Sequence, residues 1–346
     1  MGREGDGLMK CLMLEGPGLA AVKDIPEPQP AGADEILLEV KLVGLCGSDL
    51  NSYRGRNPMV SYPRVPGHEV AAVVAETSPT HPEWPAGMAV TLSPYSNCGA
   101  CAACLRGRPN ACEHNQTLGV QRDGALAERI AVPVSRLYRA ELSLKELCLV
   151  EPLTVGFHAA ARGRVAQGDT VAIFGCGGVG LGAVAGAAFR EATVIGIDLD
   201  DAKLATAQSA GAAHTVNTAS ENLHERLSEL TGGRGPDVVI EAIGLPQTFR
   251  AAVEEVSFTG RVIYIGYAKE PVEYETKLFV QKELDIRGSR NALPEDFLEV
   301  IRMLEAKRFP VEEAVTRVVP LDEAPEALET WSQTPSRFTK IMIQVS

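Results

Sequence analysis

Residues 170–189, "TVAIFGCGGVGLGAVAGAAF", carry no charged side chain over twenty consecutive positions. A single helix of that length would be long enough to span a membrane. However, six of the twenty residues are glycine, and the first five are rich in β-branched and aromatic side chains. This composition predicts a buried strand, a tight glycine turn and a buried helix rather than a membrane span.

The same strand-and-helix rhythm continues along the chain. The apolar run "TVIGID" (193–198) precedes a helical pattern at 200–212, and "PDVVIEAIG" (236–244) precedes another at 246–256. Apolar strands that alternate with helices are typical of a parallel sheet covered on both faces. An α/β unit is therefore expected from about residue 165 onward.

The chain before this unit has a different texture. From about 9 to 150, short apolar runs such as "EILLEVKLVG" (35–44) are broken by turns rich in proline and glycine, which is typical of small β-barrels. After about 289 an amphipathic helix pattern (293–309) leads to a closing strand, "FTKIMIQV" (338–345). Because this tail resembles the first texture, the α/β unit is predicted to be an insertion into a β-rich domain.

The turn in the quoted segment has the pattern Gly175-x-Gly177-x-x-Gly180, with Gly178 and Val179 between the last two glycines. In such a turn one glycine permits the bend, one lets the backbone approach a pyrophosphate, and one lets the helix pack on the strand. The helix N-terminus then offers free N–H groups to phosphates. The pattern predicts a dinucleotide site, with a plain tight turn as the alternative.

Asp198 ends the second strand, eighteen residues beyond Gly180. A carboxylate at this place accepts hydrogen bonds from the adenosine ribose and repels a 2′-phosphate. No arginine follows at 199–202. NAD is therefore expected rather than NADP, and a helix N-cap is the alternative role for Asp198.

The bulk properties exclude several classes of protein. A length of 346 residues suggests two domains. The net charge of −12 argues against partners such as nucleic acid and anionic membrane surfaces. The first sixteen residues contain acids and no sustained apolar stretch, so no secretory signal is expected and the cytoplasm is the predicted compartment.

Four of the eight cysteines form the pattern Cys98-x2-Cys101-x2-Cys104-x7-Cys112. In a large chain without a signal, clustered thiols indicate a metal site rather than disulfides. Four thiolates at these spacings suit one tetrahedral Zn²⁺ with a closed coordination shell. An iron–sulfur cluster is the main alternative, and four unrelated buried cysteines are the other.

A second set of metal-ligating side chains is scattered along the β-rich part: Cys46 in "GLCGSDLN", His68 and Glu69 in "VPGHEV", and Glu151 in "LVEPLTVG". Thiolate, imidazole and carboxylate ligands together leave a corner open for water or substrate, as in catalytic zinc sites. Each of these residues alone is more often structural. Spacing in the sequence does not by itself bring them together.

The motifs "CGSD", "GHE", the four cysteines, "EPL" and the glycine turn occur in this order over essentially the whole chain. In this combination the sequence resembles the zinc-containing medium-chain dehydrogenase superfamily, in its polyol (sorbitol) dehydrogenase-like branch, which includes threonine and sugar-acid dehydrogenases. The resemblance implies an α/β protein with a GroES-like catalytic domain at 1–155 and 290–346, a structural zinc lobe near 95–115, and a Rossmann domain at 156–289. It also implies chemistry in a cleft between the domains, and a homodimer or homotetramer.

The resemblance further implies the roles of individual residues. Cys46 and His68 match catalytic zinc ligands, and Glu69 matches a residue that ligates zinc in some members only. Glu151 stands where polyol-type members place their third ligand, and Ser48 matches the hydroxyl that hydrogen-bonds the reacting oxygen. With the four cysteines as the structural site, two zinc ions per chain are expected.

Two nearby residues do not fit the catalytic set. Cys148 lies three residues before Glu151 and is expected in the core. Many family members have histidine five residues after the zinc-binding cysteine, at the outer end of a proton relay, and here that residue is Asn51. The relay is therefore expected to run through ribose hydroxyls and water, or through Glu151.

The activity that follows is hydride transfer from a secondary alcohol to NAD, with zinc acidifying the hydroxyl and Ser48 accepting its proton. A polyol or an aldonate-type sugar acid is the expected substrate. Threonine and a general alcohol are the alternatives, and a non-catalytic protein that binds NAD and zinc is an alternative of another class. An arginine would suit a carboxylate or a row of hydroxyls. Arg290 is the leading candidate for this contact, and Arg54, Arg56 and Arg122 are weaker ones.

Overall fold

The computed structural model describes residues 7–346 and divides the chain into two compact units. Of the described residues, unit 1 comprises 7–151 and 314–346, and unit 2 comprises 152–313. The predicted second boundary, at 289/290, therefore differs from the observed one at 313/314. The reason is helix α9 (Pro294–Glu305), whose Asp296 pairs with buried His158 of unit 2 at 2.8 Å.

Unit 1 is built on a seven-stranded sheet with the order β16-β17-β3-β4-β5-β9, in which β8 also pairs with β3. In β8, Ile130 and Val132 are buried and the residues beside them are partly exposed, the period of two expected of a strand with one buried face. The elements of this sheet are β3 (Glu35–Leu45), β4 (Glu69–Val74), β5 (Ala89–Leu92), β8 (Arg129–Pro133), β9 (Leu137–Arg139), β16 (Arg317–Pro320) and β17 (Ile341–Gln344).

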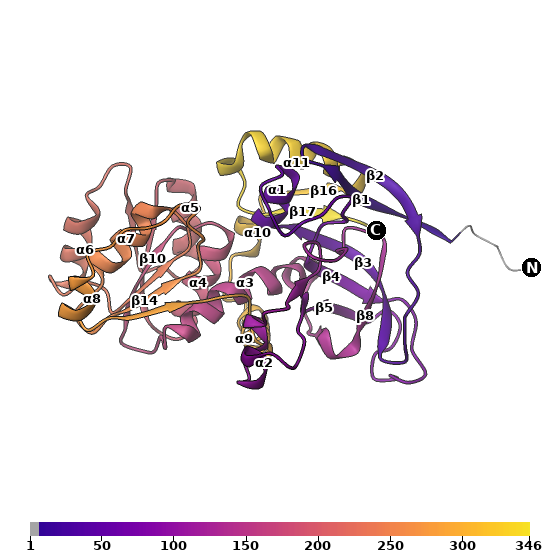
Figure 1. Ribbon diagram of the computed structural model, residues 1–346, viewed down its shortest axis with the longest axis horizontal. Helices are drawn as coiled ribbons and strands as arrows, with labels where there is room; N and C mark the ends of the chain where they lie inside the picture. The colour runs from indigo at the N-terminus through magenta and orange to yellow at the C-terminus, as the bar shows by residue number, and fades with distance from the viewer. Residues whose placement is uncertain (1–6) are drawn as a thin grey trace, which may run out of the picture. The chain divides into compact units, whose positions relative to one another are not determined.

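Smaller elements complete unit 1 (Figure 1). A hairpin and a short two-stranded ribbon stand outside the large sheet, and the ribbon flanks the four cysteines. These elements are β1 (Leu8–Gly16), β2 (Leu19–Pro26), β6 (Tyr95–Ser96), β7 (Gln116–Thr117), and helices α1 (Gly47–Tyr53), α2 (Ala102–Leu105) and α11 (Ala324–Gln333). Helix α3 (Leu144–Arg162) begins in unit 1 and continues into unit 2.

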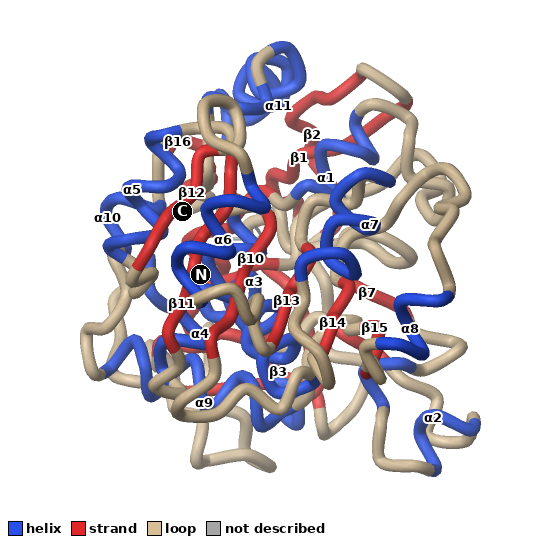
Figure 2. Tube along the Cα trace, turned by 90° about the vertical axis from the view of Figure 1, so that its left-hand side faces the viewer, coloured by secondary structure: helices blue, strands red, loops and turns tan. Residues whose placement is uncertain are grey.

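Unit 2 contains the predicted parallel sheet, with six strands in the order β12-β11-β10-β13-β14-β15 (Figure 2). Every neighbouring pair is parallel. Its strands are β10 (Thr170–Phe174), β11 (Thr193–Asp198), β12 (His214–Asn217), β13 (Val238–Glu241), β14 (Arg261–Tyr264) and β15 (Asp285–Gly288). Its helices include α4 (Gly178–Phe189), α5 (Asp201–Ser209), α6 (Leu223–Thr231), α7 (Pro246–Glu255) and α8 (Lys277–Gln281), and α10 (Val311–Ala314) lies at its end.

The strand order reverses between β10 and β13. From β10 the chain moves outward to β11 and β12, and then returns to β13 on the other side of β10. Because parallel crossovers are right-handed, α4 and α5 cover one face of the sheet and α7 covers the other. Ligands of such sheets bind outside the carboxyl ends of the strands at this switch point, which is where β10 runs into the glycine turn.

The uncharged segment 170–189 is β10, the turn and α4, as the sequence predicts. A search of all described helices finds none with the length and apolar character needed to cross a membrane.

Candidate active site and metal centres

Three of the predicted ligands meet at one edge of the sheet in unit 1. Strand β3 ends one residue before Cys46, and β4 begins at Glu69, directly after His68. In the antiparallel pairing of these strands Gly44 lies opposite Glu69, so both loops open at the same edge. The ligand atoms of Cys46, His68 and Glu69 all lie within 4.8 Å of one another. We call these three residues the mixed cluster.

Gly44 makes room for the carboxylate of this cluster. A Cβ atom at residue 44 would lie 2.0 Å from Oε2 of Glu69. Any larger residue would therefore push the Glu69 carboxylate away from its place beside Cys46 and His68.

Lys340 lies at the same edge and was not predicted. Ile341 begins β17 opposite Leu45 of β3, so the residue before it lies beside the mixed cluster. The Lys340 ammonium is buried and donates to both carboxylate oxygens of Glu69 at 2.6 Å. Burial alone would lower the pKa of Lys340, but the charge of Glu69 raises it above its usual value. Both oxygens of Glu69 thus share one charged partner, the Lys340 ammonium.

Asp49, also not predicted, ties the two ligand-bearing loops together. Its carboxylate accepts hydrogen bonds from the backbone N–H of Cys46 at 2.9 Å and of Gly67 at 3.2 Å, and lies 3.9 Å from Nδ1 of His68. Burial lowers the pKa of His68, yet the charges of Asp49 and Cys46 raise it well above its usual value. The field around His68 therefore favours positive charge, as a cation site requires.

Ser48 lies in the first turn of α1, next to the mixed cluster in sequence. Its Oγ is buried and has no hydrogen-bond partner among the residues that the structure describes, and the same is true of Nδ1 of His68. Buried polar atoms are normally paired, so an unpartnered hydroxyl two residues after a metal-ligating cysteine suits a bound oxygen ligand. Asn51, further along the helix, is exposed.

Glu151 is buried in α3 but lies outside the mixed cluster as defined by the 4.8 Å criterion. Its Oε1 accepts a hydrogen bond from the hydroxyl of Tyr95 in β6, a residue that the sequence did not single out. Burial, followed by the charge of Glu151, raises the pKa of Tyr95 well above its usual value, so the phenol stays a donor. Cys148 is fully buried, as expected of a core residue.

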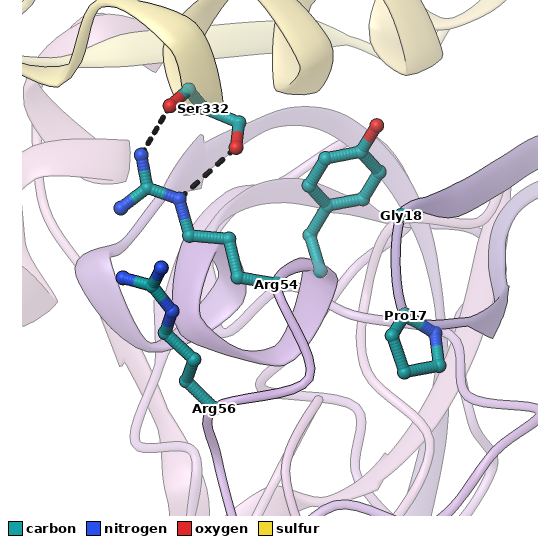
Figure 3. Close-up of a pocket in the computed structure, with 6 residues that line it drawn as sticks. Pro17, Gly18, Arg54, Arg56 and Ser332 are labelled. Carbon is teal, nitrogen blue, oxygen red and sulfur yellow. Dashed lines mark hydrogen bonds between the residues drawn. The ribbon is translucent and has the colours of Figure 1, made fainter.

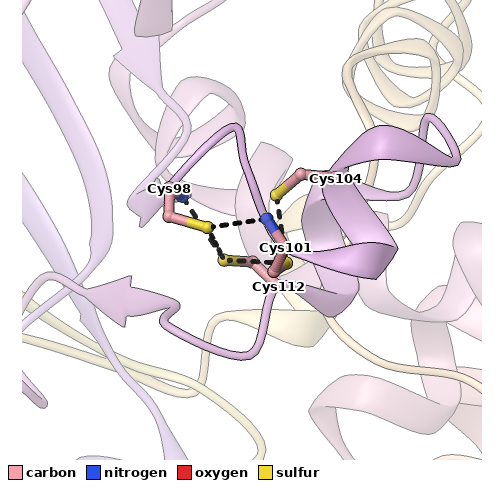
Figure 4. Close-up of side chains that lie close together, drawn as sticks. All are labelled: Cys98, Cys101, Cys104 and Cys112. Carbon is pink, nitrogen blue, oxygen red and sulfur yellow. Dashed lines mark hydrogen bonds between the residues drawn. The ribbon is translucent and has the colours of Figure 1, made fainter.

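The four-cysteine cluster, Cys98, Cys101, Cys104 and Cys112, is gathered by the lobe between β6 and β7 (Figure 4). Sulfur atoms lie 3.5 Å apart for Cys101 and Cys104, 3.8 Å for Cys101 and Cys112, and 3.6 Å for Cys98 and Cys112. A tetrahedral zinc with bonds of about 2.3 Å places its thiolates about 3.8 Å apart. An iron–sulfur cluster needs wider spacing because several ions lie between its thiolates.

The thiol chemistry of this cluster also suits zinc. Hydrogen bonds from the backbone N–H groups of Cys104 and then Glu113 lower the pKa of Cys101 to about 6. Zinc binds the thiolate form of cysteine, so this backbone arrangement prepares Cys101 as a ligand at neutral pH, whereas burial and the neighbouring thiols raise the pKa of Cys104 to about 12.

The dinucleotide turn in unit 2 has the geometry that its glycines predict. Gly175 has φ of 93°, and a Cβ at Gly180 would lie 1.7 Å from the carbonyl oxygen of Gly175. Gly177 is the N-cap of α4 and has no side-chain cap, and a Cβ there would meet nothing within 4 Å. The first N–H groups of α4, starting with those of Gly178 and Val179, have no side-chain cap. The space at Gly177 in front of them is open, which suits a pyrophosphate.

Asp198 is the last residue of β11 and lies beside this turn. Its carboxylate accepts from the N–H of Cys176 at 2.8 Å and of Leu199 at 2.7 Å. The N-cap of α5 is Asp200, whose side chain accepts from Ala202 at 2.9 Å. The alternative role of Asp198 as the helix N-cap is therefore wrong.

The arginines considered for substrate binding lie in different places. Arg54 and Arg56 line a cavity of about 440 Å³ in unit 1, where Nε of Arg54 donates to Ser332 Oγ at 3.0 Å (Figure 3). Arg122 donates to Ser96 Oγ at 3.0 Å, so Arg54 is bound to helix α11 and Arg122 to strand β6 within unit 1. Arg290 is exposed, two residues beyond β15 of unit 2.

The two units and the metal-ligating clusters together define a zinc-binding dehydrogenase. Residues 32–141 match the alcohol dehydrogenase GroES-like domain family, and 178–306 match the zinc-binding dehydrogenase family. The chain belongs to the zinc-type alcohol dehydrogenases, in the branch of sorbitol and sugar-acid dehydrogenases. The predicted superfamily, fold class and oxidoreductase activity are thereby confirmed.

Particular relatives cover nearly the whole chain. An uncharacterized zinc-type alcohol dehydrogenase-like protein of Haemophilus influenzae is 35% identical over 96% of this chain and 98% of its own. Sorbitol dehydrogenase of Bacillus subtilis is 32% identical over 97% of both chains. L-galactonate-5-dehydrogenase of Escherichia coli K12 is 31% identical over 89% of this chain and 90% of its own.

A solved structure agrees over the same extent. The alcohol dehydrogenase rspB of Escherichia coli CFT073, in complex with NADH, aligns with a TM-score of 0.90 and 29% identity. The alignment covers 98% of this chain and 100% of that chain.

Proposed function

We propose that the protein oxidises a secondary alcohol of a polyol or sugar acid, with NAD as the hydride acceptor and zinc at the mixed cluster. The observation that carries the proposal is the meeting of Cys46, His68 and Glu69 within 4.8 Å, together with the buried hydroxyl of Ser48, two residues after Cys46, which has no partner in the described part of the chain. A second zinc is assigned to the four-cysteine cluster, where its role is structural.

The chain's own residues have distinct tasks in this reaction. A bound zinc supplies Lewis-acid polarisation of the substrate hydroxyl. Ser48 accepts the hydroxyl proton, Asp49 holds the loops of Cys46 and His68, and the glycine turn of unit 2 holds the NAD that takes the hydride. The exposed Asn51 cannot carry a proton onward, so the proton leaves Ser48 through ribose hydroxyls and water or through Glu151.

We also propose that Glu151, rather than Glu69, completes the protein ligands of this zinc. Both oxygens of Glu69 are bonded to the Lys340 ammonium, which balances its charge. Glu151 accepts a hydrogen bond from Tyr95, whose neutral phenol brings no counter-charge, and burial raises the pKa of the Glu151 carboxyl. As a ligand, Glu151 would join Cys46 and His68 from helix α3.

The relatives support the class of substrate. Sorbitol and L-galactonate, named for two of them, are chains of secondary hydroxyls, and L-galactonate also carries a carboxylate. Zinc-loaded protein should reduce NAD with at least one of sorbitol, galactonate, gulonate and threonine, and the panel separates polyol, sugar-acid and amino-acid substrates. Cys46→Ser should abolish turnover and leave NADH binding intact. No activity on the whole panel would favour a non-catalytic NAD- and zinc-binding protein.

Arg290 remains the proposed contact for a substrate carboxylate. If it has this role, Arg290→Met should raise KM for galactonate and leave KM for sorbitol unchanged, because only galactonate carries a negative charge. An equal change for both substrates would contradict the assignment.

The choice of nicotinamide cofactor is proposed from Asp198. A carboxylate at the end of β11 repels the 2′-phosphate of NADP, so NADH should bind more tightly than NADPH in a fluorescence titration. Equal binding would show that Asp198 does not discriminate. The cytoplasm stays the proposed compartment.

A further inference from the structure

Tyr95 connects the lobe of the four-cysteine cluster to the carboxylate of Glu151. Tyr95 lies in β6, three residues before Cys98, and its hydroxyl donates to Oε1 of Glu151 in α3. Tyr95 and Glu151 are 56 residues apart in the chain. The position of the phenol therefore depends on what holds β6.

The ribbon that carries Tyr95 is very short. Strand β6 contains two residues, and among the described strands it pairs with β7 alone, through Tyr95 with Thr117 and Ser96 with Gln116. Two backbone-paired residues cannot form a stable ribbon alone. Something beyond the ribbon must therefore hold it in place.

The four-cysteine cluster closes the ribbon at its open end. Cys98 follows β6 by two residues and Cys112 precedes β7 by four, and their sulfur atoms lie 3.6 Å apart. The N–H of Cys98 also donates to the Cys112 sulfur at 3.4 Å. Arg122 adds a brace through its bond to Ser96 Oγ at 3.0 Å, and the backbone just before β6 is held by Leu118 N–H to the Pro94 carbonyl at 3.1 Å and by Ser93 N–H to the Arg136 carbonyl at 2.9 Å.

We propose that Tyr95 is the positioning residue for Glu151, and that zinc in the four-cysteine cluster holds Tyr95 in place, which couples the two zinc sites. The inference rests on the proposed function, because it assigns Glu151 to the zinc of the mixed cluster. The hydroxyl fixes the orientation of the carboxylate, as hydrogen-bonding partners of metal ligands generally do. Loss of such a partner typically weakens metal binding by about 10–100-fold.

The direct test uses zinc-loaded protein and the substitution Tyr95→Phe, which removes only the hydroxyl. Zinc release to the chromogenic chelator 4-(2-pyridylazo)resorcinol should occur in two phases, and the phase missing in Cys46→Ser belongs to the mixed cluster. That phase should become about 10–100-fold faster in Tyr95→Phe, with the other phase unchanged. Cobalt substituted for this zinc should show a changed visible spectrum.

Tyr62→Phe is the matched control. Tyr62 lies in the same unit and its hydroxyl donates to the backbone carbonyl of Ser52, so it loses one comparable hydrogen bond. Zinc release from the mixed cluster should stay within twofold of wild type in this variant. An unchanged release rate in Tyr95→Phe, or equal acceleration in both variants, would overturn the inference.

The coupling between the sites is tested with Cys101→Ser. Loss of the structural zinc should speed release from the mixed cluster in the wild-type background, and should add little in the Tyr95→Phe background, because the link is already broken. If the two substitutions accelerated zinc release independently, so that their factors multiplied in the double variant, the coupling would be overturned. Arg122→Met keeps all four thiols and loosens the ribbon, so it should give a smaller acceleration, and it serves if Cys101→Ser does not fold.

The failure of the inference is distinguishable from failure of the proposed function. Two zinc ions per wild-type chain with no effect of Tyr95→Phe would overturn the inference alone. A single zinc per chain, with no phase lost in Cys46→Ser, would overturn the proposed function and the inference with it.

Discussion

At the scale of single residues, the buried ion pair of Lys340 and Glu69 has a large energetic consequence. Both side chains are almost fully buried, with exposed fractions of 6% and 1%. Charges at such depth lose their hydration and are tolerated only when paired. The pair therefore fixes the place of Glu69 and sets the charge that a metal in the mixed cluster experiences.

Replacing Lys340 by methionine should destabilise the protein strongly. The variant leaves the Glu69 carboxylate buried beside Asp49 and Glu151 without its counter-charge, which costs about 3–5 kcal/mol in comparable cases. Urea unfolding followed by circular dichroism measures the loss. The double variant Lys340→Met with Glu69→Gln removes both charges and should recover part of it. If the double variant were as unstable as the single one, packing rather than charge would explain the effect.

At the scale of secondary-structure elements, the glycine turn between β10 and α4 contains one structural glycine, Gly180, and one glycine expected to face the ligand, Gly177. Gly180→Ala drives a Cβ against the carbonyl of Gly175, so it should cost about 1–3 kcal/mol of stability and disturb the turn. Gly177→Ala meets no protein atom within 4 Å and should change stability by no more than about 0.5 kcal/mol.

The two variants should therefore differ in how they lose NADH. In Gly177→Ala the methyl group stands where the pyrophosphate approaches, and NADH binding should weaken by about tenfold or more, with the melting temperature unchanged. Fluorescence titration and thermal unfolding measure the two quantities. Wild-type NADH affinity in Gly177→Ala would contradict the assignment of the pyrophosphate to this turn.

The elements of unit 2 could be predicted because their signals are local. The strands at 193–198 and 236–244 are apolar runs followed by helical patterns, and the glycine turn has its own spacing. Helix α9 could be predicted as a helix but not placed in its unit. Its assignment depends on long-range contacts such as that between Asp296 and His158, for which an amphipathic pattern carries no information.

At the scale of the whole molecule, the candidate site could be predicted only in part. Cys46, His68 and Glu69 belong to recognisable motifs, and the resemblance to known dehydrogenases grouped them. Lys340 and Tyr95 have no motif of their own. Lys340 reaches Glu69 only through the pairing of β17 with β3, and Tyr95 reaches Glu151 only through the fold of the cysteine lobe.

The two proposed metal sites have different roles, one structural and one catalytic, which predicts opposite effects for two similar substitutions. Cys101→Ser removes a ligand from a closed zinc shell that folds a lobe with little core of its own, so it should lower the melting temperature and speed amide hydrogen exchange in residues 95–117. The strands of unit 2 should keep their protection. With zinc in excess, the fractional loss of turnover in Cys101→Ser should be smaller than its fractional loss of unfolding free energy.

Cys46→Ser should show the reverse, because this thiolate belongs to the site with an open position for substrate. Its melting temperature and its exchange pattern should stay near wild type, and its turnover should be lost at any zinc concentration. Hydrogen exchange by mass spectrometry and steady-state kinetics on the same preparations compare the two variants directly. Full turnover in Cys46→Ser together with none in a folded Cys101→Ser would assign the chemistry to the four-cysteine cluster. We do not expect this outcome, because four thiolates already close the coordination shell of one ion and leave a substrate no place to bind.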